Sequence, residues 1–308
     1  MDAARVADEF GLGRVRCASS EPVGRGRQGL VWRLETSEGR WAVKVAHGVV
    51  DEERLAAAAA FADAAVAAGV PTPAVRRTAS GAVCSASTSV TAWVDLLQPD
   101  TLLDPSLVGA AVAGLHRVAP PAVGPVEDWY AAPVGAPAWD DLVARLASAG
   151  APFADELGRL RGELVALESW LEPPTDLVTC HRDLWADNLL PTVDGGVCVL
   201  DWDNCGPAAR DQELACVLFE FARGDAGRAS ALVEAYAAVG GPARVTRRGD
   251  FSMLVAQLGH IVEIGCRDWL APTDRSPTRD DAEAWVRQGL DDPHTRAVLD
   301  ALLVAVRP

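Results

Sequence analysis

The amino-acid sequence predicts an α+β protein with two lobes, a small β-rich lobe over residues 1–95 and a larger, mainly helical lobe over residues 96–308. Two observations lead to this prediction. Short β-prone runs separated by turn residues fill the chain between residues 20 and 95, and long helix-forming segments separated by Pro and Gly clusters dominate from residue 100 onward. The composition changes near residue 96, where we expect the boundary between the lobes.

The N-terminal strands are predicted from alternating β-prone residues and turn signals. The runs 30–34 and 41–45 flank the turn residues Ser37-Glu38-Gly39, which is typical of a β-hairpin. Residues 83–86 and 89–94 are further strand candidates. The small lobe is therefore expected to contain an antiparallel sheet.

The helices are predicted from runs of helix formers that end at breakers. The alanine-rich segment 51–68 contains no internal breaker, and Gly69 and Pro71 end it. In the larger lobe the same reasoning predicts helices over residues 106–118, 139–149, 153–171, 212–222, 226–239, 251–269, 279–290 and 295–306. Two short apolar runs, 177–179 and 197–200, interrupt these helices and predict strands.

The charge and cysteine content limit the possible partners and compartments. The sequence has 28 Lys and Arg against 43 Asp and Glu, a formal net charge of −15, which argues against nucleic-acid binding. The acidity indicates either a generally acidic, solubilising surface or a preference for a cationic small molecule. The seven cysteines form no C-x-x-C pair, so neither a disulfide framework nor a zinc knuckle is indicated. No run approaches the about 18 uncharged apolar residues of a membrane span, and the first residues do not resemble a signal peptide. We therefore expect a cytoplasmic protein that contacts no membrane; the sequence indicates no oligomeric state.

The residues with the clearest chemical pattern lie between the two short apolar runs. The segment 181–188 reads His-Arg-Asp-Leu-Trp-Ala-Asp-Asn, and Asp201-Trp202-Asp203 follows a short apolar run. Phosphoryl transfer requires a carboxylate that accepts the proton of the attacking hydroxyl and oxygen ligands that hold Mg²⁺ on the nucleotide phosphates. Asp183 fits the first role, and Asn188 and Asp201 fit the second. The combination predicts a phosphotransferase site.

A glycine-rich segment near the N-terminus is the second chemical pattern. Gly24, Gly26 and Gly29 precede a predicted strand rather than a helix, which argues against a dinucleotide-binding fingerprint. A glycine-rich hairpin lets backbone N–H groups approach nucleotide phosphates closely. Arg25 and Arg27 could add positive charge there, although they could equally be exposed residues at a hairpin tip.

Lys44 is the candidate contact to the nucleotide phosphates. It lies in an apolar strand, where an unpaired charge would be costly. We expect its acidic partner on the following helix, at Glu53, with Glu52 as the alternative.

These motifs in this order resemble the aminoglycoside phosphotransferase and choline-kinase-like family, which has the bilobal fold of protein kinases. The resemblance covers most of the chain and extends to Leu115-His116 and to 206–215. It implies transfer of a phosphoryl group from ATP or GTP, with Mg²⁺, to a hydroxyl of a small molecule. The roles it implies are Asp183 as base, Asn188 and Asp201 as Mg²⁺ ligands, Lys44 as phosphate anchor, and the backbone of Ala92 and Val94 as the surface that faces adenine. The chain departs from the family at Arg182 and Trp185, where a small residue and a second histidine are more common.

Two other functions are disfavoured. A protein kinase would carry a D-F-G motif, a long activation segment and an A-P-E motif, whereas a helical stretch over 212–222 follows Asp201-Trp202-Asp203 almost at once. A regulatory protein that binds nucleotide without catalysis would lack a catalytic group, and none is missing here.

The acceptor is expected to lie beside the catalytic loop and the C-terminal helices. Its candidate contacts are Asp187, Glu220, Glu263 and Asp268, which would suit a cationic acceptor. Inactivation of an antibiotic by O-phosphorylation is our first interpretation, and phosphorylation of a metabolic alcohol such as choline, homoserine or a sugar is the alternative. No residue in the sequence separates the two.

Overall fold

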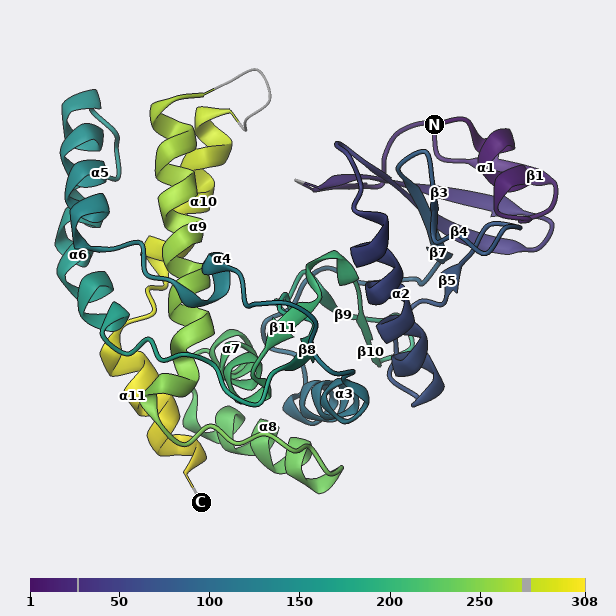
Figure 1. Cartoon of the computed structure of the whole chain (residues 1–308). Coiled ribbons are helices and arrows are strands. Elements are labelled where there is room, and N and C mark those ends of the chain that lie inside the picture. Colours follow the sequence, from purple (N-terminus) through teal and green to yellow (C-terminus); the bar gives the residue numbers. More distant parts are fainter. Residues whose placement is uncertain (27, 273–277, 308) are drawn as a thin grey trace.

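The computed structural model describes residues 1–26, 28–272 and 278–307. Its N-terminal part is rich in strands and its C-terminal part is helical, so the α+β prediction is confirmed (Figure 1). The strands of the N-terminal sheet are β1 (Val15–Ala18), β2 (Gly24–Arg25), β3 (Gly29–Thr36), β4 (Gly39–Ala46), β5 (Val75–Arg76), β6 (Cys84–Ser85) and β7 (Thr88–Ala92). Their order is β1-β3-β4-β7-β5, with β2 on β3 and β6 on β7.

The predicted hairpin is present as the pair β3 and β4. The two strands are antiparallel, with Gly29 opposite Ala46 and Thr36 opposite Gly39. The sheet buries Leu34, Val43 and neighbouring apolar side chains against α1 (Ala3–Glu9), a helix that our sequence reasoning did not predict. This packing holds β4, and with it Lys44, in a fixed register.

The alanine-rich helix is α2 (Glu52–Ala67), and it links the sheet to the helical part. Asp51 caps its N-terminus by accepting a hydrogen bond from the Arg54 N–H. Phe61 of α2 packs edge to face on Trp202, with ring centroids 5.1 Å apart. The helix therefore connects the N-terminal sheet to the segment that carries Asp201.

Each helix predicted after residue 100 is present in the structure, with ends shifted by up to a few residues. The helices are α3 (Pro105–Val118), α4 (Asp128–Ala131), α5 (Ala136–Ala149), α6 (Ala154–Glu168), α7 (Arg210–Ala222), α8 (Ala226–Ala238), α9 (Ser252–Leu270), α10 (Arg279–Asp291) and α11 (Arg296–Val306), together with the 3₁₀ turns η1 (Trp202–Asn204) and η2 (Arg248–Phe251). The short helix α4 was not predicted. No helix within the described residues has both the length and the apolar character needed to cross a bilayer.

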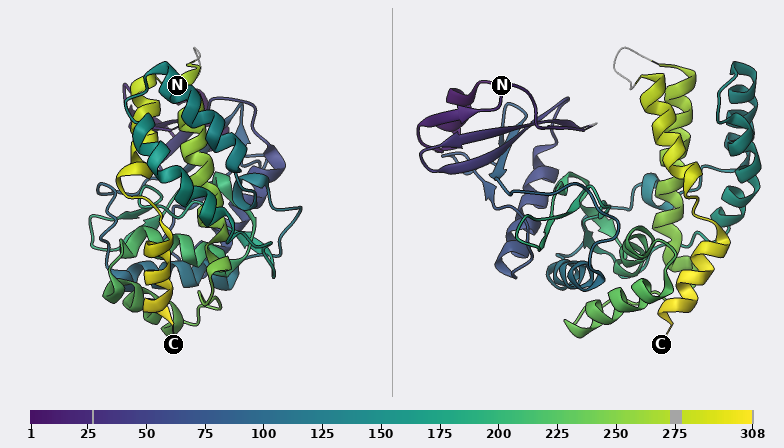
Figure 2. Two further views of the ribbon diagram at one scale, coloured as in Figure 1. Left: turned by 90° about the vertical axis from the view of Figure 1, so that its left-hand side faces the viewer. Right: turned by 180° about the vertical axis from the view of Figure 1, so that it is seen from behind.

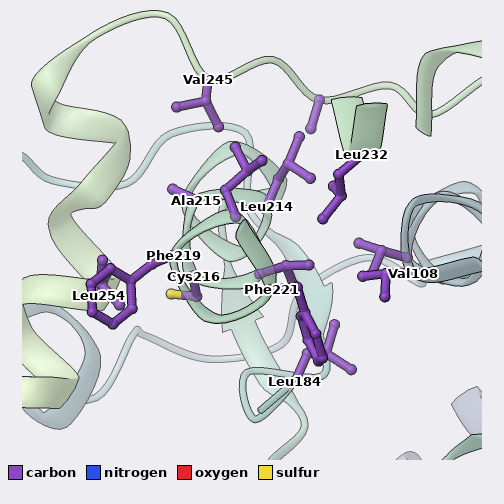
Figure 3. Close-up of a cluster of buried hydrophobic side chains, with 14 of the residues drawn as sticks. Val108, Leu184, Leu214, Ala215, Cys216, Phe219, Phe221, Leu232, Val245 and Leu254 are labelled. Atoms are coloured by element: carbon purple, nitrogen blue, oxygen red, sulfur yellow. The ribbon is translucent and has the colours of Figure 1, made fainter. Parts of the chain in front are cut away.

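Helix α7 lies at the centre of the largest hydrophobic core. Every residue from Gln212 to Ala222 is buried, and Leu214, Phe219 and Phe221 pack among side chains from α3, α8 and α9 (Figure 3). A second core joins α5, α6, α9 and α10. Because α7 is surrounded on all sides, any polar group that it carries needs a partner inside the protein.

Four short strands form the segment between the N-terminal sheet and the helices α5, α6, α9 and α10. They are β8 (Val178–Cys180), β9 (Leu189–Pro191), β10 (Val197–Val199) and β11 (Gly206–Ala208). Both predicted apolar runs are strands, but they do not pair with each other, because β8 pairs with β11 and β9 with β10. Figures 1 and 2 show the N-terminal sheet and the helices α5, α6, α9 and α10 on opposite sides of this segment.

Candidate active site

The loop between β8 and β9 carries Asp183, and hydrogen bonds hold one oxygen of its carboxylate. Its Oδ2 accepts hydrogen bonds from Asn188 Nδ2 at 2.8 Å and from Asn204 Nδ2 at 2.9 Å. Within the described residues, no hydrogen bond reaches Oδ1. Both amide donors therefore fix one carboxylate oxygen and leave the other able to accept a proton.

The surroundings of Asp183 make it a stronger base than an exposed aspartate. Burial raises the pKa of its carboxyl to about 6, the hydrogen bond from Asn204 opposes this rise, and the negative charges of Asp187 and Asp201 add to it. Burial dominates because water is excluded from the half-buried side chain. The carboxylate is thus suited to accept a proton near neutral pH.

Lys44 of β4 meets the acidic segment that follows β10. Its Nζ donates to Asp201 Oδ1 and Asp203 Oδ2, each at 2.8 Å. Burial alone would lower the pKa of Lys44, but the two carboxylates outweigh burial and raise it. Asp201 has a left-handed backbone with φ of 52°, which turns the chain out of β10 at this point. The ammonium therefore joins the N-terminal sheet to the catalytic segment.

The predicted pairing of Lys44 with Glu53 does not occur in this structure. The ion pairs of the described residues place Lys44 with Asp201 and Asp203, and neither Glu52 nor Glu53 is among its partners. Both glutamates are exposed in the first turn of α2. The side chain of Lys44 faces the C-terminal part of the molecule, where two carboxylates already supply its counter-charge.

The oxygen atoms around Lys44 also fit a divalent cation. Asp201 and Asp203 converge on one point, since both accept a hydrogen bond from the same nitrogen at 2.8 Å. Asn188 donates to Asp183 from its amide nitrogen, so its amide oxygen takes no part in that contact. Carboxylate and amide oxygens are ligands that Mg²⁺ prefers. Asn188 and Asp201 were predicted for this role; Asp203 was not, although its position two residues after Asp201 was a signal.

The glycine-rich loop lies against the catalytic segment. Gly29 is buried at the start of β3, where an added Cβ would lie 2.5 Å from the Val45 carbonyl oxygen, so only glycine fits. The Gly26 N–H donates to the Gly29 carbonyl at 3.0 Å and forms the turn. Gln28 Nε2 donates to Asn204 Oδ1 at 3.2 Å.

Of the other residues of this loop, Gly24 is half-buried, Arg25 is exposed, and Arg27 lies outside the described part of the chain. Gly24 and Arg25 form β2, and Arg25 is exposed. Arg27, predicted as a possible source of positive charge, lies outside the described residues. Among the described residues, the side chain of Gln28 connects this loop to Asn204, which in turn contacts Asp183.

The two residues predicted to face adenine lie at the end of β7 (Ala92) and just after it (Val94). The Ala92 N–H donates to the Ala74 carbonyl at 2.9 Å, so this N–H is already used within the sheet. Val94 has no backbone hydrogen bond within the described residues. Of the two, Val94 retains the free backbone groups that an adenine ring requires.

Buried side chains support the backbone of the catalytic loop. The Arg182 N–H donates to the carboxylate of Glu213, which also contacts His116 Nε2 at 2.8 Å. His116 Nδ1 contacts the Tyr236 hydroxyl at 2.8 Å. His181 Nε2 contacts the Leu200 carbonyl at 2.9 Å, which supports a bracing role rather than a reactive one. Glu213 lies within residues 206–215, which carry part of the family resemblance, but the sequence indicated no role for it.

The four predicted acceptor residues differ in their surroundings. Asp187 is exposed in the catalytic loop, where partial desolvation raises the pKa of its carboxyl. Glu220 is buried, and its carboxylate accepts a hydrogen bond from the Ala186 N–H at 3.1 Å and pairs with Arg223 at 2.9 Å.

The two candidates on α9 lie further from the loop in sequence. Glu263 pairs with His260 at 2.9 Å and Arg267 at 2.6 Å, and Asp268 is half-buried on the same helix. Glu220 and Glu263 are thus already neutralised by internal partners, because buried carboxylates require them. Asp187 has no ion-pair partner among the described residues.

Comparisons with known proteins agree with this geometry. The profile of the phosphotransferase enzyme family matches residues 19–248. No curated protein matched the sequence. Among solved structures, the chain is similar to a spectinomycin phosphotransferase, APH(9)-Ia, in complex with ADP and spectinomycin (13% identity, 98% of this chain and 97% of that chain covered, TM-score 0.67).

Two further solved structures have the same fold. One is an aminoglycoside phosphotransferase from Alicyclobacillus acidocaldarius (17% identity, 95% and 92% covered, TM-score 0.60). The other is the choline kinase LicA from Streptococcus pneumoniae (12% identity, 94% and 96% covered, TM-score 0.61). The family profile spans most of the chain and includes the glycine-rich loop, Lys44, the catalytic loop and Asp201, so the chain belongs to the phosphotransferase enzyme family and is a small-molecule kinase.

Proposed function

We propose that this protein transfers the γ-phosphoryl group of ATP to a hydroxyl of a small-molecule acceptor, with Asp183 as the base. The observation that carries this proposal is the arrangement of Asp183, whose Oδ2 is held by two amide donors while Oδ1 accepts no hydrogen bond from the described residues. A base must have one oxygen that can approach the hydroxyl and a fixed orientation while it does so.

The chemical step follows from this geometry. Asp183 accepts the proton of the acceptor hydroxyl as the hydroxyl oxygen forms a bond to the γ-phosphorus. The bond between that phosphorus and the oxygen bridging to the β-phosphorus breaks, and ADP leaves. The protein mainly positions the reactants, because phosphoryl transfer requires little covalent chemistry from the enzyme.

Nucleotide binding relies on a local positive region in an acidic protein. The amides of the glycine-rich loop and the ammonium of Lys44 are the groups that would contact the phosphates, and the backbone of Val94 would contact adenine. Asn188 and Asp201 would hold Mg²⁺, which offsets negative charge on the phosphates when it is bound. The similar spectinomycin phosphotransferase was solved with ADP, which supports an adenine nucleotide as donor.

For the acceptor we propose an antibiotic, and a cationic one is favoured by the exposed carboxylate of Asp187 beside the base. The similarity to a spectinomycin phosphotransferase supports this choice. The similarity to a choline kinase supports the alternative, a metabolic amino alcohol.

The test is ADP release from MgATP with a panel of acceptors that includes spectinomycin, aminoglycosides, macrolides, choline and homoserine. We expect turnover with an antibiotic, and we expect Asp183→Asn to lower kcat by about 10²- to 10⁴-fold while ATP still binds. Glu234→Gln is the matched control, because Glu234 is exposed on α8.

Two results would overturn parts of this proposal. Turnover confined to metabolic alcohols would replace the antibiotic by the alternative acceptor. Turnover by Asp183→Asn equal to that of Glu234→Gln would remove Asp183 from the role of base.

A further inference from the structure

We infer that Asn204 is a positioning residue for the catalytic base and that the buried guanidinium of Arg182 holds Asn204 in place. This inference rests on the proposed role of Asp183. Asn204 was described above only through its hydrogen bonds, the side chain of Arg182 was given no role, and Arg182 is one of the two positions at which the chain departs from the family that it resembles.

Asn204 connects three parts of the site. Its Nδ2 donates to Asp183 Oδ2 at 2.9 Å, and its Oδ1 accepts from Gln28 of the glycine-rich loop at 3.2 Å. Its backbone carbonyl accepts from Arg182 Nε at 2.8 Å. The side-chain amide thus orients one oxygen of the base, Gln28 holds the amide from its Oδ1, and Arg182 holds the backbone that carries it.

Arg182 is enclosed and cannot easily shift. Only 2% of its surface is exposed, and its guanidinium carbon lies 3.9 Å from the centre of the Tyr130 ring. Its Nη2 pairs with Glu127 at 3.3 Å. A Cβ at Gly206 would lie within 2.3 Å of this guanidinium, so the strand β11 closes the space on another side. These contacts hold the cation rigidly under the catalytic loop.

The cost of burying Arg182 indicates a specific role. Its Nη1 is buried without a hydrogen-bond partner among the described residues, which destabilises the folded protein. An apolar side chain would fill the same space without this penalty. The guanidinium adds a hydrogen bond to Asn204 that no apolar side chain can make. We therefore infer that Arg182 holds Asn204, that Asn204 orients Asp183, and that Asp183 is the group that reacts.

The side chain of Arg182 also connects the catalytic loop to α4, through a cation–π contact and an ion pair. Tyr130 and Glu127 lie in and just before this helix, and both contact the guanidinium of Arg182. Asp183 is thus positioned by groups from α4, η1 and the glycine-rich loop. Loss of one link should change how often the carboxylate has the reactive orientation, and should leave nucleotide binding largely unchanged.

The test uses Asn204→Ala and Asn204→Asp. In Asn204→Asp the side chain keeps its shape, but when ionised it cannot donate a hydrogen bond to Asp183. If Asn204 only filled space, this variant would remain active. With MgATP and the best acceptor of the panel, or with water as acceptor, we expect kcat to fall about 10- to 100-fold in both variants, while KM for ATP changes less than threefold. Glu234→Gln serves as the control.

Arg182→Met tests the second link. We expect its kcat to fall, and we expect the double variant Arg182→Met/Asn204→Ala to have a kcat within about twofold of Asn204→Ala alone, because residues acting in series are not additive. If Arg182→Met does not fold, as judged by circular dichroism, Arg182→Lys takes its place.

A readout besides activity is the crystal structure of nucleotide-free Asn204→Ala. We expect the carboxylate of Asp183 to be rotated or to have two orientations. Unchanged kcat in Asn204→Ala and Asn204→Asp together with an unchanged Asp183 would overturn this inference and leave the proposed function intact. Absence of turnover by the wild type with every acceptor would instead overturn the proposed function, and the crystal structure would still decide the role of Asn204.

Discussion

The ammonium nitrogen of Lys44 lies 2.8 Å from Asp201 Oδ1, although the two residues are 157 positions apart in the sequence. The same nitrogen lies 2.8 Å from Asp203 Oδ2. A lysine from the N-terminal sheet thus supplies the counter-charge for two carboxylates that fit a metal ion. The proposed nucleotide and metal sites therefore share one side chain.

Replacing Lys44 should weaken nucleotide binding. We expect Lys44→Met to raise the Kd for ATP by about tenfold or more, since a hydrogen bond to a charged group contributes about 1.5–3 kcal/mol. Isothermal titration calorimetry with ATP measures this directly. Arg16→Met removes the same charge from an exposed position on β1 and should leave the Kd unchanged. Equal affinities of the two variants would contradict a role of Lys44 in binding phosphate.

Replacing Asp201 should abolish turnover without unfolding the protein. We expect Asp201→Ala to be inactive at saturating Mg²⁺, because it removes a carboxylate from the proposed metal site, while its circular dichroism spectrum matches the wild type. Asp194→Ala, in the exposed turn between β9 and β10, is the control. Full activity of Asp201→Ala would show that this residue does not hold the metal.

Adding one methyl group at Gly29 should destabilise the N-terminal sheet. A Cβ there would lie 2.5 Å from the Val45 carbonyl oxygen and 3.1 Å from the Ala46 Cα. We expect Gly29→Ala to lower the free energy of unfolding by about 1–3 kcal/mol, as overpacking does. Gly48→Ala is the control, since nothing lies within 4 Å of its added Cβ. Urea denaturation of both variants measures the difference, and equal stability would contradict the close approach of β3 and β4.

The buried histidine between α10 and α11 should make stability depend on pH. His294 is 2% exposed, and burial lowers its pKa to about 4, against an ordinary value of 6.5. Between these values the unfolded chain binds a proton that the folded chain does not, so acid favours unfolding. From pH 7 to pH 5 this group should cost about 2 kcal/mol of stability.

The measurement compares the wild type with His294→Gln by urea denaturation at both pH values. Other carboxylates are common to both proteins and cancel in the comparison, and the hydrogen bond from Arg296 lowers the pKa of the neighbouring Glu163, so this group stays ionised between pH 7 and pH 5. We expect the wild type to lose about 2 kcal/mol more than the variant on acidification. Parallel losses in the two proteins would show that His294 is protonated in the folded state.

The prediction of helices from sequence was accurate because their signals are local. The helix at 51–68 has its cap at Asp51 and its breakers within a few residues, and the structure places it at Glu52–Ala67. The equally short strands β8 and β10 were predicted from their apolar residues, whereas β9 and β11 were missed because Pro191 in β9 and Gly206-Pro207 in β11 are residues typical of loops. The helix α4 was missed because four residues carry too little helical pattern, although it supplies Tyr130 beside Arg182.

The sequence by itself determined the α+β class and the family-like order of motifs, and it singled out Asp183, Asn188 and Asp201. Their residue types and spacing follow from the chemistry of phosphoryl transfer. Only the tertiary structure decided the partners of these groups. Glu53 was expected beside Lys44 because it is near in sequence, yet Lys44 binds Asp201 and Asp203. Asn204 reaches Asp183 because β8 pairs with β11 rather than with β10. Such contacts depend on which side of a strand faces the next segment, and local sequence patterns do not specify this when the partners lie far apart in the chain.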